Sequence, residues 1–200
     1  MIENGIVLID KPAGMTSFGV VARVRRVLSA QIGKKAKVGH TGTLDPFATG
    51  LMIIVTGKEC KNAGMYSKLD KVYEATIHLG QTSTTGDPEG DMTDVSDRVP
   101  TIDEVQVTLA HFMGIITQRP PIYSAIKIDG ERAYKLARAG KPVDMPERQI
   151  TVHSLDLIEY SYPDICIRTH VSSGTYIRTL AQDIGAALGT GAYCTQLRRT

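Results

Sequence analysis

The chain has 200 residues, of which 42% are hydrophobic, and its 23 basic and 21 acidic side chains give a formal net charge of +2. This length suits one compact domain with one core. No apolar run approaches the roughly 20 residues of a membrane helix, and the N-terminus lacks a secretion signal, so we expect a soluble, cytoplasmic protein. The three cysteines are too far apart for a disulfide framework or a CxxC metal site.

The charges are distributed unevenly along the chain. Residues 1–61 carry nine basic and four acidic side chains, residues 62–110 carry three and nine, and residues 111–200 carry eleven and eight. Two basic ends around an acidic middle suit a polyanion that contacts two separate parts of the chain, although ordinary scatter of surface charge produces similar counts. The charge pattern alone therefore carries little weight.

The N-terminal quarter predicts a strand followed by a helix. Residues 5–9 (GIVLI) form an apolar run that ends in the turn-forming segment 10–14. Thr16 or Ser17 can then cap a helix, because polar side chains with an oxygen are preferred at that position. The apolar residues of this helix recur at helical spacing at Val20, Val24, Val27 and Leu28.

Two strands and a long loop follow. The continuous apolar run 51–56 (LMIIVT) lies between two glycines, which predicts a central strand covered on both faces. Residues 72–79 alternate between apolar and polar, which predicts a half-buried strand with Tyr73 on its apolar face. Residues 81–100 are polar and acidic, and form a longer loop than compact domains usually contain without a function or mobility.

The second half continues this mixture of helices and strands. We expect a helix at 101–112, a strand at 115–117, and an irregular segment at 119–149 with a helix near 131–139. Strands, helices and loops interleave without an internal repeat, so the sequence predicts a fold of the mixed α and β type.

The last third predicts an antiparallel strand pair and a helix. Residues 150–157 and 165–171 alternate as strands on either side of a turn at 162–164. A helix that opens at Thr175 comes next. Its apolar stripe consists of Ile177, Leu180, Ala181, Ile184 and Leu188.

The motifs of several other enzyme classes fail on spacing. Six residues separate Gly50 from Gly57, and Glu59 follows Lys58, whereas a phosphate-binding loop needs four residues and a Ser or Thr. Segment 172–174 (SSG) lacks the glycines of a nucleophile elbow, and no cysteine pair could hold the zinc of a deaminase. A hydrolytic triad or a metal-activated water is thus unsupported.

The densest cluster of residues whose side chains could take part in catalysis lies at 37–50 (KVGHTGTLDPFATG). Its three glycines allow backbone conformations that other residues avoid, and Pro46 stiffens the chain directly after Asp45. An acidic side chain is thereby fixed on a constrained loop beside the predicted central strand, where catalytic groups tend to lie. From spacing alone, an Asp-Pro step that merely starts a turn is the commoner explanation.

The segment 39–50 (GHTGTLDPFATG) resembles the signature of the TruB family of tRNA pseudouridine synthases. Further segments resemble the family in family order, so the resemblance covers essentially the whole chain. These segments are 10–17, 71–74, 120–127, 132–134, 173–181 and 197–200. The resemblance implies the α+β pseudouridine synthase fold, a mixed and largely antiparallel sheet flanked by helices, with a basic RNA-clamping insertion at about 119–149.

The resemblance also implies roles for individual residues. Asp45 corresponds to the catalytic nucleophile, Arg178 to the arginine that orients it, and Tyr73 to the tyrosine that stacks on the uracil and assists proton removal. Without the resemblance, Arg178 would be taken for an exposed arginine and Tyr73 for a core tyrosine. The resemblance assigns substrate contacts to His40, Tyr176 and Leu197, and phosphate contacts to Lys127, Arg132 and Arg138.

Asp87 corresponds to a recurrent family aspartate, but its place in the acidic loop favours a solvated charge. Family members continue past segment 197–200 into a further strand region and a C-terminal RNA-binding domain, and both are missing here. We therefore describe 1–200 as the catalytic domain and expect tRNA affinity, more than chemistry, to be affected.

The expected reaction is isomerisation of the T-loop uridine of tRNA, at position 55, to pseudouridine. It involves no redox step or external group transfer, so we expect no cofactor and no metal, with the tRNA T-stem-loop as partner of a monomeric protein. The buried uridine must be flipped out to be reached. Two alternatives remain: a pseudouridine synthase for another RNA, such as the guide-RNA-dependent type, and a non-catalytic RNA-binding protein or tRNA chaperone.

Overall fold

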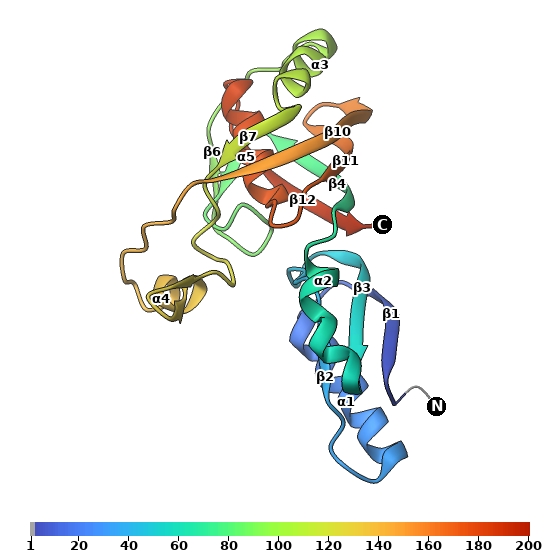
Figure 1. The fold of residues 1–200 in the computed structure, drawn as a ribbon. Coiled ribbons are helices and arrows are strands. Elements are labelled where there is room, and N and C mark those ends of the chain that lie inside the picture. Colours follow the sequence, from blue (N-terminus) through green and yellow to red (C-terminus); the bar gives the residue numbers. More distant parts are fainter. Residues whose placement is uncertain (1–2) are drawn as a thin grey trace. The chain divides into compact units, whose positions relative to one another are not determined.

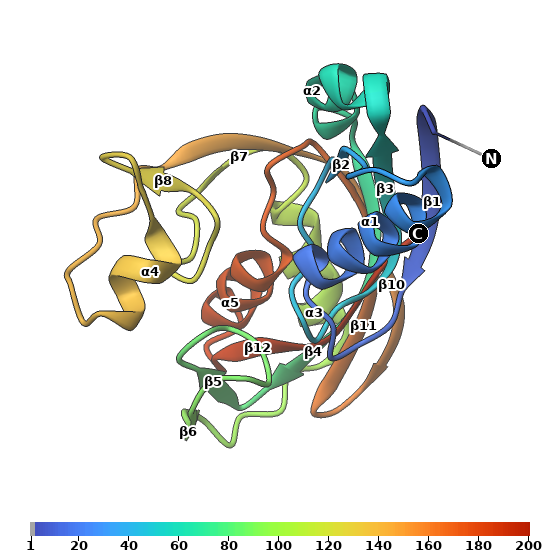
Figure 2. The same cartoon turned by 90° about the horizontal axis from the view of Figure 1, so that it is seen from below.

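The computed structural model describes residues 3–200, which divide into two compact units. The first unit contains residues 3–71 and 198–200, and the second contains residues 72–197. Each unit carries mostly antiparallel strands with helices against them, which confirms the predicted α+β class (Figures 1 and 2). No helix among the described residues is long and apolar enough to cross a membrane.

Three strands form the sheet of the first unit. Strands β1 (Gly5–Lys11) and β2 (Val38–His40) each pair antiparallel with β3 (Thr49–Thr56). The end of β12 (Ala192–Arg199) also belongs to this unit, where it runs parallel to the start of β3. The predicted first strand and the apolar strand after the aspartate loop are both confirmed.

Gly50 explains how closely β12 approaches β3. Its φ is +102°, and a Cβ added there would lie 2.1 Å from the backbone oxygen of Arg199. A side chain at this position would therefore clash with backbone and strain the chain. Glycine lets the two strands meet directly after the loop that carries Asp45.

Helix α1 (Ser17–Ile32) covers one face of this small sheet (Figure 2). Thr16 caps it by accepting a hydrogen bond from the backbone N–H of Gly19. Val20 and Val21 are buried, but Val27 is 50% exposed, so its predicted place on the buried stripe is wrong. The short helices η1 (Gly57–Asn62) and α2 (Ala63–Ser67) follow β3.

Strand β3 is covered less symmetrically than its continuous apolar sequence predicts. Met52 and Ile54 on one face are fully buried, whereas on the other face Val55 is fully buried but Leu51 and Ile53 are only half-buried. Leu8 of β1, whose partner in β3 is Ile53, is 64% exposed. In an unbroken apolar run both faces of the strand carry apolar residues, so the sequence does not show which face is more deeply buried.

The sheet of the second unit has the strand order β12–β4–β11–β10–β7. Here β10 (Arg148–Ser161) pairs antiparallel with both β11 (Asp164–Val171) and the edge strand β7 (Gly114–Gln118). Strand β4 (Lys71–Leu79) alternates as predicted, and its inward residues are buried. These residues are Tyr73, Ala75, Ile77 and Leu79.

Two helices pack in the second unit. Helix α5 (Ile177–Ala187) buries the apolar stripe expected from the sequence, and α3 (Ile102–His111) begins with a capping box between Thr101 and Glu104. The predicted opening of α5 at Thr175 is wrong. Tyr176 occupies the N-cap position, while the Thr175 hydroxyl donates to the carbonyl of Ser172 and tightens the turn before the helix.

The long acidic segment 81–100 contains a small hairpin. Strands β5 (Gln81–Ser83) and β6 (Met92–Asp94) pair antiparallel and enclose an ordered loop. Backbone hydrogen bonds join Thr84 to Asp91 and Gly86 to Ser83 within that loop. Segment 81–100 therefore contains regular structure although its composition is polar.

Segment 119–147 forms a second excursion from the sheet of the same unit. It contains the two-residue strands β8 (Lys127–Ile128) and β9 (Glu131–Arg132) and the helix α4 (Ala133–Arg138). Both ribbon views show α4 set apart from the sheet of its unit (Figures 1 and 2). The helix is shorter than the predicted 131–139, since residues 131 and 132 extend the hairpin instead.

Candidate functional site

The loop that carries Asp45 is fixed on its N-terminal side by Ser17. The Ser17 hydroxyl donates to the carbonyl of Leu44 and accepts from the N–H of Leu44, both at 2.8 Å. Ser17 is 3% exposed, so water does not compete effectively for these bonds. One side chain, 27 residues earlier in the sequence, thus holds both polar groups of the residue before Asp45.

Lys11 fixes the other side of Asp45. Its fully buried ammonium donates to the carbonyls of Pro12, Met15 and, at 3.2 Å, Pro46. The N–H of Gly14 also donates to the Pro46 carbonyl, at 2.8 Å. Both residues flanking Asp45 are therefore held by segment 11–17, which explains why the two motifs 10–17 and 39–50 occur together.

Arg199 gives the loop a third attachment within the same unit. Its guanidinium donates to the carbonyls of Gly42 and Leu51, and the side chain is buried. The Asp45 side chain itself is only half-buried. A carboxylate on a rigid, partly open loop is suited to nucleophilic or proton-transfer chemistry.

In the second unit Arg178 forms a buried ion pair with Asp87. The guanidinium Nη1 lies 3.1 Å from Asp87 Oδ2, and the two side chains are 3% and 6% exposed. Arg178 also donates to the carbonyls of Thr85, at 2.8 Å, and Tyr123, at 2.9 Å. A guanidinium in this setting keeps one orientation, because rotation would break several charge-assisted bonds at once.

Asp87 is in turn held by its own loop. Its Oδ1 accepts from the hydroxyl of Thr85, at 2.6 Å, and from the N–H of Glu89, at 3.0 Å. The expectation of a solvated loop charge at Asp87 is therefore wrong. Burying an arginine demands a compensating charge nearby, and the hairpin loop supplies it.

The two aromatic candidates lie in different surroundings. Tyr73 is 8% exposed on the inward face of β4, as a core tyrosine would be. Tyr176 is half-buried, and the buried amide of Gln118 bonds to both its N–H and its carbonyl. Leu197, near the end of β12, is buried at 7% exposure. These three side chains and Arg178 all belong to the second unit.

The other candidates divide between the units. His40 ends β2 in the first unit and is half-buried, five residues before Asp45. The three basic candidates of segment 119–147 are exposed, which leaves them open to phosphate. Arg132 donates to the carbonyl of Ala125, and Arg138 lies 5.9 Å from the ring centroid of Tyr134. The third is Lys127.

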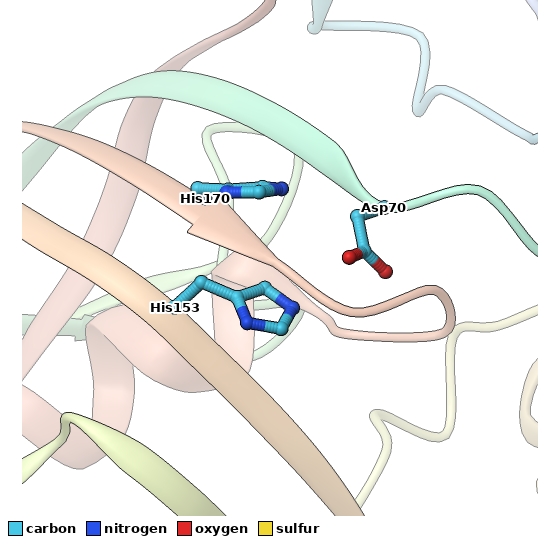
Figure 3. Close-up of side chains that lie close together, drawn as sticks. All are labelled: Asp70, His153 and His170. Atoms are coloured by element: carbon cyan, nitrogen blue, oxygen red, sulfur yellow. The ribbon is translucent and has the colours of Figure 1, made fainter.

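Two histidines of the second unit lie side by side. The ring centroids of His153 on β10 and His170 on β11 are 4.7 Å apart, with 43° between the ring planes (Figure 3). His153 occupies the register shift between Val152 and Ser154. Asp70, also drawn in Figure 3, belongs to the first unit. Two imidazoles are fewer than the three or four protein ligands of known zinc sites, so this pair alone does not define a metal centre.

Known proteins are similar to this chain in sequence and fold. The profile of the TruB family pseudouridylate synthase N-terminal domain matches residues 25–177. Two solved structures are similar in fold over 100% of this chain. A chain of the Cbf5-Nop10-Gar1 complex has a TM-score of 0.74 and 32% identity, and 49% of that chain is covered. A chain of an H/ACA RNP bound to a substrate RNA containing 2'-deoxyuridine has a TM-score of 0.71 and 30% identity, with 47% covered.

Curated relatives are closer in sequence. Proteins named tRNA pseudouridine synthase B are 46% identical in Azoarcus sp. (strain BH72), over 100% of this chain and 65% of the relative, and in Corynebacterium efficiens, over 99% and 67%. The chain thus spans about two thirds of the length of these relatives. Motifs and fold together are those of the pseudouridine synthase class. The chain belongs to the TruB family of pseudouridylate synthases.

Proposed function

We propose that this chain is the catalytic portion of an enzyme that isomerises the T-loop uridine of tRNA, at position 55, to pseudouridine. The supporting observation is the aspartate loop, in which both neighbours of Asp45 are held by buried side chains while Asp45 itself is half-buried. Family membership supports the reaction and the tRNA substrate. The proposed partner is the T-stem-loop, and the enzyme acts as a cytoplasmic monomer.

The reaction exchanges one bond for another on the same uridine. The glycosidic bond from the ribose C1' to N1 breaks, the uracil turns, and a bond from C1' to C5 forms. C5 then loses its proton and N1 gains one, so atoms and electrons balance without an oxidant or a transferred group. Asp45 acts either as a nucleophile that adds to the sugar or the ring, or as a base that removes a sugar proton to give a glycal.

Two further residues, Tyr73 and Arg178, assist Asp45 in the proposed reaction. Tyr73 stacks on the uracil and assists removal of the C5 proton. Arg178 keeps the carboxylate of Asp45 ionised and oriented. A guanidinium suits that task because it carries a fixed charge and several donors, and its bonds to Asp87 and two carbonyls set its direction in advance.

Substrate binding uses the other candidates. The uridine must leave its stack, which costs a few kcal/mol, and contacts with His40, Tyr176 and Leu197 offset that cost. The exposed cations Lys127, Arg132 and Arg138 contact RNA phosphates without reading sequence.

Replacing Asp45 by Asn tests the proposal. With tRNA labelled with tritium at C5 of its uridines, we expect the wild-type chain to release tritium and Asp45→Asn to release none, because an amide is a poor nucleophile. Binding of tRNA by the variant should be nearly unchanged. Glu59→Gln is the matched control, since it makes the same chemical change on η1 of the same unit. We expect it to retain activity.

The same assay separates the alternatives. Tritium release that survives Asp45→Asn would disprove the nucleophile assignment. Wild-type binding without release would favour an RNA-binding or chaperone function. Loss of tritium release from a tRNA whose sole change is cytidine at position 55 would support the T-loop position. Other RNAs should then react far more slowly than tRNA, and comparable release from them would favour a pseudouridine synthase for another RNA.

A further inference from the structure

Gln118 is a fully buried polar side chain that the proposed reaction does not use. It ends the edge strand β7, where its backbone pairs with Arg148 of β10. Its amide Nε2 donates to the carbonyl of Tyr176 at 3.1 Å, and its Oε1 accepts from the N–H of Tyr176 at 2.8 Å. These bonds join residues 58 positions apart in the sequence.

These two hydrogen bonds fix the direction of the backbone at Tyr176. The N–H belongs to the peptide plane before the residue and the carbonyl to the plane after it, so holding both sets the φ and ψ angles between them. Tyr176 has φ −105° and ψ 109°, and it is the N-cap of α5 without a side-chain capping bond of its own. Gln118 thus stabilises a helix start that lacks a local cap.

The start of α5 carries two of the candidate site residues. Tyr176 itself has a half-buried side chain, and Arg178 is the second residue of the helix. A shift of Tyr176 would turn the first turn of α5 and move the guanidinium away from Asp87 and the carbonyl of Thr85. Both side chains therefore depend on the same backbone anchor.

We infer that Gln118 is a positioning residue for the isomerisation, because it sets the start of α5 and thereby the placement of Tyr176 and Arg178. This inference rests on the proposed function. An amide is the suitable group here, since Tyr176 presents one donor and one acceptor and Gln supplies one of each. Glutamate, when ionised, accepts only, and methionine offers neither a comparable donor nor a comparable acceptor.

The expected effect is on the rate rather than on binding. A displacement of about 1 Å at a catalytic group can lower a rate about 100-fold. Gln118 is buried and so does not itself contact RNA, which leaves the exposed cations of segment 119–147 to hold the tRNA. Loss of the anchor should therefore lower the single-turnover rate and leave the dissociation constant for tRNA almost unchanged.

The experiment compares Gln118→Met and Gln118→Glu with the wild-type chain at pH 8. Single-turnover tritium release gives the rate, filter binding gives the dissociation constant, and circular dichroism with thermal melting checks the fold. Thr169→Val is the matched control. Thr169 is also fully buried in this sheet, and its hydroxyl donates to the carbonyl of Ser154 at 2.8 Å, within the sheet rather than to α5.

We expect Gln118→Met to release tritium about 100-fold more slowly with nearly wild-type tRNA binding, and Gln118→Glu to be slowed as well. Thr169→Val should keep a rate close to wild type, although it lowers the melting temperature. If Gln118→Met does not fold, Gln118→Glu, which keeps the acceptor, decides by the same criteria.

Three results would overturn the inference. Wild-type rates in folded Gln118 variants would show that the anchor is unnecessary. An equal rate loss in Thr169→Val would show that any lost buried hydrogen bond suffices. A loss confined to tRNA binding would place Gln118 in recognition instead. An inactive wild-type chain would be a failure of the proposed function, and it is distinguished from these results because no variant is needed to observe it.

Discussion

Replacing Asp87 by Asn removes the charge that compensates Arg178 while keeping the shape of the side chain. Exposed ion pairs contribute at most about 1 kcal/mol, but removing one partner of a buried pair costs about 3–5 kcal/mol. The Arg178–Asp87 pair belongs to the second class, since its side chains are 3% and 6% exposed. An Asn at this position can still accept from Thr85 and Glu89, which places the expected loss of unfolding free energy near the lower limit, at about 3 kcal/mol.

Urea unfolding measures this loss directly. With a slope of about 2 kcal/mol per molar urea, a loss of about 3 kcal/mol lowers the midpoint by about 1.5 M. Tritium release should fall in parallel, because a guanidinium without its carboxylate partner loses a fixed orientation. Binding of tRNA should change little.

A double-mutant cycle provides the decisive comparison. Asp87→Asn, Arg178→Met and the double variant are unfolded under the same conditions. If the two charges compensate each other, the double variant is much less destabilised than the sum of the single variants, with a coupling of about 2 kcal/mol or more. Additivity within about 0.5 kcal/mol would refute the reasoning.

Two further predictions concern Ser17 and Asp183. Ser17→Ala leaves both polar groups of Leu44 without their buried partner, which should cost about 1–3 kcal/mol in urea unfolding and slow tritium release. Ser67→Ala, at an exposed site of the same unit, should change neither, and equal effects would contradict the role of Ser17. Burial raises the pKa of Asp183 from 3.8 to about 6, so the folded state binds more protons between these values and stability declines as pH rises through that window. After discounting for its partial exposure, Asp183→Asn should stabilise the chain by about 1–2 kcal/mol at pH 8 and nothing at pH 3, and a pH-independent difference would be inconsistent with this origin.

Local sequence patterns predicted the elements whose periodicity is continuous. Strand β4 and helix α5 bury the residues that their alternation and helical spacing indicate. The hairpin of β5 and β6 was missed because three-residue strands are too short to show a period, and its polar composition suggested a loop. Val27 was wrongly predicted to be buried. Helical spacing shows which residues share one face of α1, but not how much of that face the neighbouring strands cover.

The candidate site was predictable only in part, for a different reason. Asp45 could be named as a candidate because its family motif is contiguous, whereas the groups that hold the loop come from distant segments. Ser17, Lys11 and Gln118 look like an ordinary cap, a turn lysine and a strand-end glutamine in the sequence. Only the fold shows that they are buried and bond to the neighbours of Asp45 or to Tyr176. The burial of Asp87 likewise depends on Arg178, which lies 91 residues later.

The attachment of Arg199 to Gly42 and Leu51 has a consequence for biosynthesis. Residues 3–71 leave the ribosome long before residues 198–200, which belong to the same unit. At about 5–20 residues per second, the nascent chain waits on the order of 6–25 seconds between the two events. During translation the aspartate loop is therefore without one of its three attachments, and the first unit is completed only when the end of β12 docks beside Gly50.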